Sequence, residues 1–284
     1  MSNAPLYTLL DSGHGRKLER VGGVLINRPE PQALWAPALP EAEWNKVQAT
    51  FAPKGADEEG DAGGNWINHA NLPESWPVEW QGLTFNARLT PFRHLGFFAE
   101  QAPQWEWLRS TVKPNMKVLN LFGYTGVASL VAAQAGAEVV HLDASKKAIG
   151  FGRENADVAG LGKAPIRWIL EDAIAFCQRE VRRGNRYDII LLDPPKFGRG
   201  TNGEVWEFMR DMPTLLDALR QLITPNGHVC LTAYTLRLSG VALASMLHAA
   251  LPKGEVENGE FTVSDNTGRR FGVSMWGRWH GREK

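Results

Sequence analysis

Hydrophobic and polar residues alternate along this chain in two different ways. In about the first 88 residues, short alternating runs at 24–26, 66–67 and 83–88 lie between Gly, Pro and Asn residues, and no helical period is sustained. This pattern predicts a small β-rich domain of hairpins. Within it, the acidic and glycine-rich stretch 49–65 predicts a solvated loop.

From about residue 99 the pattern changes to strands that alternate with amphipathic helices. The predicted strands are 117–122, 138–143, 166–170, 187–193 and 228–234. The predicted helices are 104–112, 127–135, 145–159 with Ser145 as N-cap, 173–182, 205–222 and 241–250. The last elements, 254–264 and 269–279, predict a hairpin with 266–268 in the turn.

Alternation of this kind predicts an α/β domain with a mostly parallel sheet and helices on both faces. We therefore divide the chain into residues 1–88, a β-rich N-terminal domain, and residues 89–284, an α/β domain.

The chemistry is concentrated at Val118–Gly126, VLNLFGYTG, where an apolar strand breaks into a turn with Gly123 and Gly126 before a helix. Backbone N–H groups at such a turn and helix start suit the carboxylate or phosphate end of a nucleotide-like ligand. Twenty residues after Gly123, the next strand ends at Asp143, whose carboxylate can accept bonds from both hydroxyls of a ribose. These features also fit a dinucleotide-binding dehydrogenase.

A second stretch, LLDPP at Leu191–Pro195, favours a methyltransferase that uses S-adenosylmethionine. Proline fixes φ and lacks an N–H group, so the Pro-Pro segment is a rigid edge that presents carbonyls. Asp193 and the carbonyl of Pro194 can accept hydrogen bonds from an exocyclic amine, and Phe197 can stack on a base. These three are the catalytic candidates. A dehydrogenase normally has a G-x-G-x-x-G turn, which FGYTG does not supply.

The motifs FGYTG, HLDASKKAI, LEDAIAF and LLDPPKF, in this order, resemble the bacterial 23S rRNA base methyltransferase family of cytosine-5 and guanine-N7 enzymes. RHLGFFAEQ at Arg93–Gln101 resembles the family's H-K-T-G-F-x-x-D-Q segment. The likeness covers about residues 88–280, and the first 80 residues do not resemble the PUA domain of many relatives. It implies a class I, Rossmann-like fold with a seven-stranded sheet, S-adenosyl-L-methionine as cofactor and ribosomal RNA as substrate.

The resemblance and the chemistry of the side chains together assign a cofactor site. The turn would surround the methionine carboxylate and ammonium, Asp143 would bind the ribose hydroxyls, and Asp172 with the N–H of Ala173 would bind the adenine amine. A helix N-cap is the alternative role for each aspartate. The expected cofactor-binding residues are Asn120, Phe122, Tyr124, Thr125, Gly126, Asp143, Ala144, Asp172, Ala173 and Gln101.

Basic residues beside these segments are the expected substrate contacts. They are Arg93, His94, Lys196, Arg199 and Arg237. The tryptophans of the first 80 residues are expected to pack the β-rich domain rather than to stack on bases, and His141 to be a core histidine. The cations of the first hairpins are either phosphate contacts or solvated charges: Arg16, Lys17, Arg20 and Arg28.

The two cysteines bear on which atom is methylated. Cytosine-5 transfer needs a thiolate that attacks the ring. In similar enzymes this cysteine follows the strand after the DPP segment, and Thr235 occupies that place here. Cys230 in mid-strand and Cys177 on an amphipathic helix are expected to be core residues. A nitrogen acceptor is therefore favoured.

Composition indicates where the protein works. A chain of 284 residues, 43% hydrophobic, can bury a substantial core. Two cysteines are too few for a disulfide framework, and neither a signal peptide nor a membrane-spanning apolar run is visible. We expect a cytoplasmic protein with no membrane partner and no metal.

The distribution of charge along the chain does not identify the class of substrate. Residues 1–80 carry 6 Lys and Arg against 11 Asp and Glu, whereas the rest of the chain carries 25 against 20. A protein that binds long duplex nucleic acid is usually more basic, but a folded RNA needs only a local patch. A protein or small-molecule substrate stays open, as does a non-catalytic RNA- or ribosome-binding module. A non-catalytic module would be expected to have lost residues of the motifs, whereas the motifs of this chain are complete. The oligomeric state is not indicated.

Overall fold

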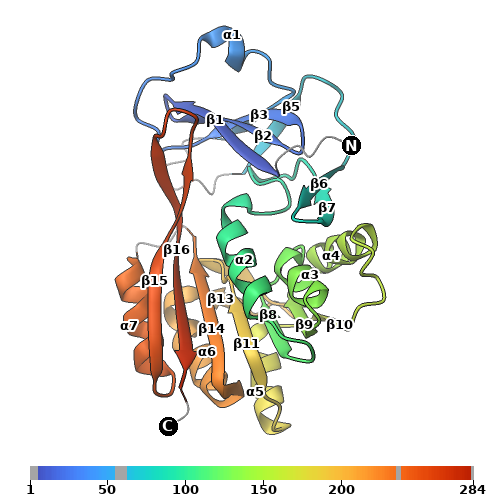
Figure 1. The fold of residues 1–284 in the computed structure, drawn as a ribbon, viewed down its shortest axis with the longest axis vertical. Coiled ribbons are helices and arrows are strands. Elements are labelled where there is room, and N and C mark those ends of the chain that lie inside the picture. Colours follow the sequence, from blue (N-terminus) through green and yellow to red (C-terminus); the bar gives the residue numbers. More distant parts are fainter. Residues whose placement is uncertain (1–5, 55–62, 235–237, 283–284) are drawn as a thin grey trace. The chain divides into compact units, whose positions relative to one another are not determined.

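The chain folds into two compact units (Figure 1). The computed structural model describes residues 6–54, 63–234 and 238–282. The N-terminal unit comprises Met1–Ala102 together with Thr262–Val273, and the second unit comprises Pro103–Phe261 together with Ser274–Lys284. The sequence predicts that the whole C-terminal hairpin belongs to the domain of residues 89–284. The tip of this hairpin belongs instead to the N-terminal unit.

The N-terminal unit is built on a five-stranded sheet in the order β1-β2-β3-β4-β5, and β6 and β7 form a separate hairpin. β3 and β4 are parallel, and the other neighbours are antiparallel. The β-rich fold predicted for this part of the chain is confirmed. Its elements are β1 (Tyr7–Gly13), β2 (Arg16–Val21), β3 (Val24–Pro29), α1 (Glu41–Trp44), β4 (Ala49–Pro53), β5 (Gly64–Asn68), β6 (Trp76–Trp80), β7 (Leu83–Ala87) and the 3-10 turn η1 (Ala99–Gln101).

The stretch 49–65 is not the loop that its acidic composition predicts. Its first five residues form β4, which pairs with β5. The reason is the alternation within ATFAP, which buries Ala49 and Phe51 completely and sets the Phe51 ring 5.3 Å from that of Trp66. Residues 55–62, which contain the acidic run, lie outside the described residues.

Three of the hairpin cations are engaged within the sheet rather than solvated: Lys17 is buried, and Arg16 and Arg28 are partly buried. Arg28 forms two hydrogen bonds with the completely buried Glu19, at 2.6 and 2.7 Å. Lys17 lies 3.3 Å from Glu30, and Arg16 donates to two backbone carbonyls of the sheet. Burial alone would raise the pKa of Glu19, but Arg28 and Lys17 outweigh it and lower the pKa to about 2. The sequence pattern missed this pairing because the partners lie on neighbouring strands.

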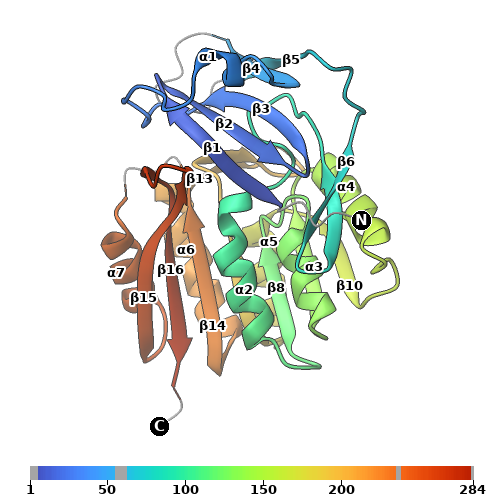
Figure 2. The ribbon, with the colours of Figure 1, turned by 45° about the horizontal axis from the view of Figure 1, so that its top comes forward.

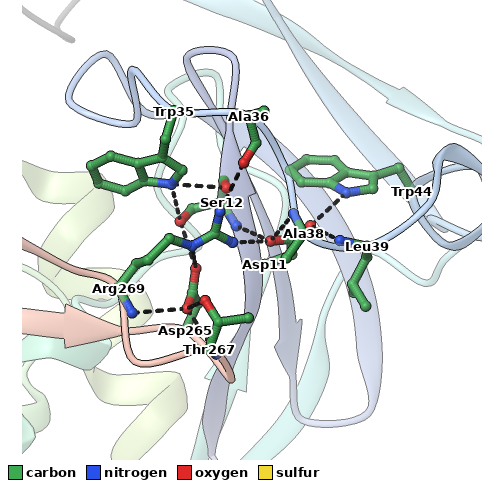
Figure 3. A network of polar contacts seen from close by, with 10 residues as sticks. All are labelled: Asp11, Ser12, Trp35, Ala36, Ala38, Leu39, Trp44, Asp265, Thr267 and Arg269. Atoms are coloured by element: carbon green, nitrogen blue, oxygen red, sulfur yellow. Dashed lines mark hydrogen bonds and ion pairs between the residues drawn. The ribbon is translucent and has the colours of Figure 1, made fainter.

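A buried polar network holds the tip of the C-terminal hairpin inside the N-terminal unit (Figure 3). Arg269 donates to Asp11 and, at 2.8 Å, to Asp265. Asp265 also accepts from the hydroxyl of Ser12 at 2.9 Å, and Asp11 accepts from the indole of Trp44 at 3.0 Å. Both aspartates are buried. The N-terminal unit is therefore assembled from two distant parts of the sequence.

The second unit contains a seven-stranded sheet in the order β10-β9-β8-β11-β14-β16-β15. The strands from β10 to β14 are parallel, and β16 runs antiparallel to β14. Figures 1 and 2 show α3 and α4 over one face and α5, α6 and α7 over the other. This arrangement confirms the predicted fold. No helix in the described part of the chain is both long and apolar enough to cross a membrane.

Most elements of this unit agree with the predicted ranges, but β14 begins at Ile223 rather than at residue 228, and the short strand β12 was not predicted. The elements are α2 (Ala102–Thr111), β8 (Lys117–Leu121), α3 (Val127–Gln134), β9 (Glu138–Asp143), α4 (Lys146–Val158), β10 (Ile166–Leu170), α5 (Ala173–Arg182), β11 (Tyr187–Leu192), β12 (Phe197–Arg199), β13 (Val205–Glu207), α6 (Phe208–Leu222), β14 (Ile223–Ala233), α7 (Gly240–Ala250), β15 (Gly254–Ser264) and β16 (Arg270–Gly281).

The range 205–222 is not one continuous helix. Its first three residues form β13, which pairs antiparallel with the short strand β12, and α6 begins only at Phe208. The run Val-Trp-Glu has the β-branched and aromatic character that suits a strand. The backbone N–H of Glu207 donates to Asp211 at 2.8 Å, which marks the change from strand to helix.

Candidate active site

Four parallel strands, β10, β9, β8 and β11, end side by side at one edge of the sheet. Their register pairs Leu121 with both Leu142 and Leu192, and Leu170 with Asp143. Ligands of open α/β sheets bind outside such carboxyl ends. The structure brings most of the expected residues to the segments that follow these strands: Phe122, Tyr124, Thr125, Gly126, Asp143, Ala144, Asp172, Ala173, Asp193, Pro194, Lys196, Phe197 and Arg199.

The turn between β8 and α3 has an unusual backbone. Phe122 and Tyr124 have φ angles of +54° and +49°, a left-handed conformation that non-glycine residues seldom adopt. Gly126 follows with φ +83°. The N–H of Gly123 donates to the carbonyl of Leu142 at 3.0 Å, which ties the turn to β9. Backbone strain of this kind persists where the surrounding structure imposes it, and it clusters at ligand sites.

A chain of buried polar side chains packs against this turn. Asn120 Nδ2 donates to Ser129 Oγ at 2.9 Å, and Ser129 Oγ lies 2.9 Å from His141 Nδ1. Burial lowers the pKa of His141 to about 3, so its ring is neutral, and it is the core histidine that the sequence indicates. A Cβ at Gly123 would lie 2.5 Å from this ring, which explains the glycine. The expected contact of Asn120 with the cofactor stays a prediction.

Two residues that the sequence analysis did not single out also fix the turn. Asn155, buried on α4, donates from Nδ2 to the carbonyl of Thr125 at 3.0 Å. Trp168 on β10 fills the space beside two glycines, because a Cβ at Gly126 or Gly152 would lie 3.1 or 2.5 Å from its ring. The glycines are the only sequence signal for this packing, and they do not reveal which ring they contact.

Asp143 ends β9 and faces the turn. Its Oδ2 accepts from the N–H of Tyr124 at 2.9 Å, and its Oδ1 accepts from the N–H of Ser145 at 2.8 Å. Burial raises the pKa of Asp143 above its usual value, and these two donors offset part of the increase. Each carboxylate oxygen has a further lone pair, so Asp143 can accept from a ribose hydroxyl without leaving its place.

The helices that begin at this edge differ in how they are capped. Ser145, as predicted, caps α4 by accepting from Ala148 at 3.2 Å, and Asp172 caps α5 by accepting from Ala175 at 2.9 Å. At α3 the N-cap is Gly126, and no side chain caps the helix. The N–H groups of its first turn therefore suit a carboxylate of a ligand. The N-cap is the alternative role that the sequence left open for Asp172, and its contact with the adenine stays a prediction.

The DPP loop, Asp193–Pro195, is held by a buried tryptophan. Trp206 on β13 is 5% exposed, and its Nε1 donates to the carbonyl of Pro195 at 2.7 Å. The same indole packs on the ring of Phe122, with the ring centroids 4.9 Å apart. One side chain thus connects the turn after β8 with the DPP loop, and nothing in the sequence pattern indicates this.

Both cysteines are interior residues, as the sequence indicates. Cys177 and Cys230 are buried, and burial raises the pKa of both thiols, that of Cys230 to about 11. Both side chains are therefore protonated at neutral pH, whereas a nucleophilic cysteine acts as the thiolate. Thr235, which aligns with the catalytic cysteine of similar enzymes, lies outside the described residues.

Three of the expected site residues lie in the N-terminal unit: Arg93, His94 and Gln101. The ring of His94 stacks on Phe92 at 5.5 Å and contacts Phe98 at 5.4 Å. Burial lowers the pKa of His94 to about 4, helped by the neighbouring arginines, so the ring is neutral at physiological pH. Their contacts with cofactor and substrate stay predictions, and Arg237 lies outside the described residues.

Comparison with known proteins identifies the family. Residues 38–237 match the family described as S-adenosylmethionine-dependent methyltransferase, and this range includes the turn after β8 and the DPP loop. The chain belongs to this family. A SAM-dependent methyltransferase from Agrobacterium tumefaciens is 46% identical, with a TM-score of 0.92 over 99% of this chain and 92% of that chain. This enzyme class, its fold and its cofactor are those that the sequence predicts.

Other relatives are more distant. SMU.776, provisionally assigned as a methyltransferase and solved with SAH, shares the fold with a TM-score of 0.76 at 16% identity, over 98% of this chain and 76% of that chain. The ribosomal RNA large subunit methyltransferase K/L of Shewanella frigidimarina is 29% identical over 186 residues, 62% of this chain and 26% of that protein. Methyltransferase I of Aeromonas salmonicida is 28% identical over 163 residues, 57% of this chain and 41% of that protein. The matched parts thus span less than half of these two relatives.

The donors and acceptors at the carboxyl edge fit S-adenosyl-L-methionine. The uncapped start of α3 suits the methionine carboxylate, because its first N–H groups carry the positive end of the helix dipole. Asp143 would accept from the ribose hydroxyls, and Asp172 with the N–H of Ala173 would provide an acceptor and a donor for the adenine, as the sequence predicts. These residues would hold the cofactor.

Proposed function

We propose that this methyltransferase transfers a methyl group to a nitrogen of a base in ribosomal RNA. The observation that carries the proposal is the DPP loop, which follows β11 at the edge where the strained turn lies and leads directly to Phe197, a ring that is 61% exposed. The DPP loop can accept hydrogen bonds from an amine, and the exposed aromatic ring that follows it along the chain can stack on a planar base. The names of the two rRNA methyltransferase relatives support RNA as the substrate.

The residues of the DPP loop act mainly by alignment. When bound, S-adenosyl-L-methionine supplies a methyl group on a positively charged sulfur. Asp193 and the carbonyl of Pro194 accept hydrogen bonds from the amine, so that its lone pair points toward the methyl group. The cofactor would give up its methyl group to the nitrogen and leave as the neutral thioether, and Asp193 would take the proton that the nitrogen loses. Phe197 stacks on the base and excludes water. Such a transfer needs orientation and no covalent enzyme–RNA adduct.

Substrate recognition is assigned to residues 1–88, and catalysis to residues 89–284. This division is supported by the expected cofactor residues, all of which follow residue 91. Arg93, His94, Lys196, Arg199 and Arg237 complete the proposed RNA contacts. An rRNA substrate implies that the enzyme works in the cytoplasm.

The proposal is tested by transfer of labelled methyl groups to rRNA from a strain that lacks the gene, followed by mass-spectrometric mapping. Asp193→Ala should lower turnover by about 10²–10³-fold because an aligned acceptor is lost, with cofactor affinity nearly unchanged. Asp217→Ala, at an exposed position on α6, is the matched control. Methylation of a protein or a small molecule but not of rRNA would overturn the substrate assignment. Normal turnover of Asp193→Ala would remove the DPP loop from the mechanism.

A further inference from the structure

The hairpin of β12 and β13, which we call the ribbon, has two different faces. Its register pairs Phe197 with Glu207, Gly198 with Trp206, and Arg199 with Val205. Residues directly opposite one another share a face, and successive residues alternate. One face therefore carries Phe197, Arg199, Val205 and Glu207, and the other carries Gly198 and Trp206.

The inner face fixes the ribbon to the DPP loop. Trp206 donates to the carbonyl of Pro195 at 2.7 Å, and a Cβ at Gly198 would lie 3.2 Å from Cγ of the same proline. The N–H of Phe208 donates to the carbonyl of Lys196 at 3.0 Å, which closes the base of the ribbon. The outer face is therefore held at a defined position beside the residues that receive the methyl acceptor.

The outer face exposes large apolar side chains. On this face, Phe197 is 61% exposed and Val205 56% exposed. Met209, which follows on α6, is 66% exposed as well. Apolar side chains gathered in this way on a rigid element are typical of a binding surface. The fold itself gains nothing from leaving them in water.

The charges of this region balance one another, with Lys196, Arg199 and Arg210 against Glu204, Glu207 and Asp211. Arg210 lies 2.7 Å from Asp211 and 3.8 Å from Glu207, and Glu204 accepts from Asn202. The region therefore does not present the surplus of cations that a phosphate-binding surface needs. Arg199, on the same face as the apolar side chains, can meet a single phosphate between contacted bases.

We infer that the outer face of the ribbon is a platform for unpaired RNA bases, on which Phe197 stacks on the methylated base and Val205 contacts a base that flanks it. The inference rests on the proposed function, since it names RNA as the partner. Apolar side chains can contact a nucleic acid through the faces of its bases, and in a duplex those faces are covered by stacking. A surface of balanced charges and exposed apolar groups therefore fits a loop or a single strand, rather than a helix.

Two variants that place opposite charges at position 205 distinguish contact with bases from electrostatic attraction to RNA. Both Val205→Asp and Val205→Lys should raise the KM for rRNA, the former by roughly tenfold, because each interrupts the apolar face. Cofactor affinity and melting temperature should stay at the wild-type values, and Val205→Ile should retain the wild-type KM. Val241→Asp and Val241→Lys on α7 are the matched controls, because Val241 is 68% exposed. An unpaired oligonucleotide should inhibit the wild type more than its duplex does.

The outcomes discriminate clearly. If Val205→Lys lowered the KM for rRNA below the wild-type value while Val205→Asp raised it, the surface would act only by electrostatic attraction. That result would overturn the inference. The same follows if the Val205 variants behave like the Val241 controls while the wild type methylates rRNA, or if the duplex inhibits as well as the single strand. Should the wild type methylate a protein and no RNA, the proposed function fails first, and the platform for RNA fails with it.

Discussion

Asp143 binds two backbone N–H groups of its own unit in addition to the ribose contact expected of it. Because Tyr124 and Ser145 hold both carboxylate oxygens, the side chain is oriented before any ligand binds. Preorganisation of this kind reduces the entropy lost on binding.

Asp143→Ala should weaken S-adenosylmethionine binding by at least tenfold in a protein that remains folded. Hydrogen bonds to a charged group contribute roughly 1.5–3 kcal/mol each, and the variant loses two toward the ribose. Titration calorimetry measures the affinity, and Asp217→Ala at its exposed position is the control. An unchanged affinity in the folded variant would remove Asp143 from the cofactor site.

The cysteines provide a second test at the residue scale. Cys177→Ser and Cys230→Ser together should retain most of the turnover, because both thiols are buried and protonated. The melting temperature should fall, since a buried hydroxyl costs about 1–3 kcal/mol when its hydrogen bonds are incomplete. A covalent complex with 5-fluorocytosine RNA that the Cys230→Ser change abolishes would instead establish cytosine-5 transfer.

At the scale of elements, the turn after β8 and the DPP loop are coupled through Trp206. Trp206→Phe should keep the packing on Phe122 but leave the carbonyl of Pro195 without its donor. We expect kcat to fall by about tenfold with cofactor affinity unchanged, because a displaced loop misaligns the acceptor. Trp206→Ala, which loses both contacts, should weaken cofactor binding as well. Wild-type kcat in Trp206→Phe would show that the indole N–H is not needed.

The strands and helices of the methyltransferase unit could be predicted because each is a continuous segment with its own period. The DPP loop and Asp143 could be found for a related reason, since each directly follows an apolar strand. Short strands such as β4 and β13 could not, because each depends on a partner strand elsewhere in the sequence. The contacts of Trp168 and Asn155 with the turn are likewise set by packing between distant elements.

At the scale of the whole molecule, acid should destabilise the N-terminal unit. The pKa of Glu19 falls from 4.5 to about 2 on folding, so its contribution is complete above pH 4.5 and is lost as the pH falls through 2. A shift of this size corresponds to about 3 kcal/mol. Asp11 and Asp265, whose hydrogen bonds outweigh burial and lower their pKa values, act in the same direction.

Thermal unfolding followed by tryptophan fluorescence should therefore show a falling melting temperature as the pH is lowered from 5 toward 2, by roughly the linkage expected for these carboxylates. Glu19→Gln should be less stable at neutral pH and should show a flatter pH dependence. Glu79→Gln, at an exposed position on β6, should leave the profile unchanged. A wild-type profile in Glu19→Gln would contradict the assignment.

The hairpin tip in the N-terminal unit has a consequence for how the protein is made. Arg269 follows Asp11 by 258 positions, and the two side chains pair within one unit, where Asp11 is buried and Arg269 partly buried. During synthesis, the first five strands leave the ribosome long before Arg269 and Asp265 are translated, so Asp11 lacks its native partner Arg269 in that interval. The N-terminal unit is therefore completed late, after six of the seven strands of the α/β sheet have been synthesised. A ribosome that stalls before residue 269 releases a chain whose first domain is as unfinished as its last.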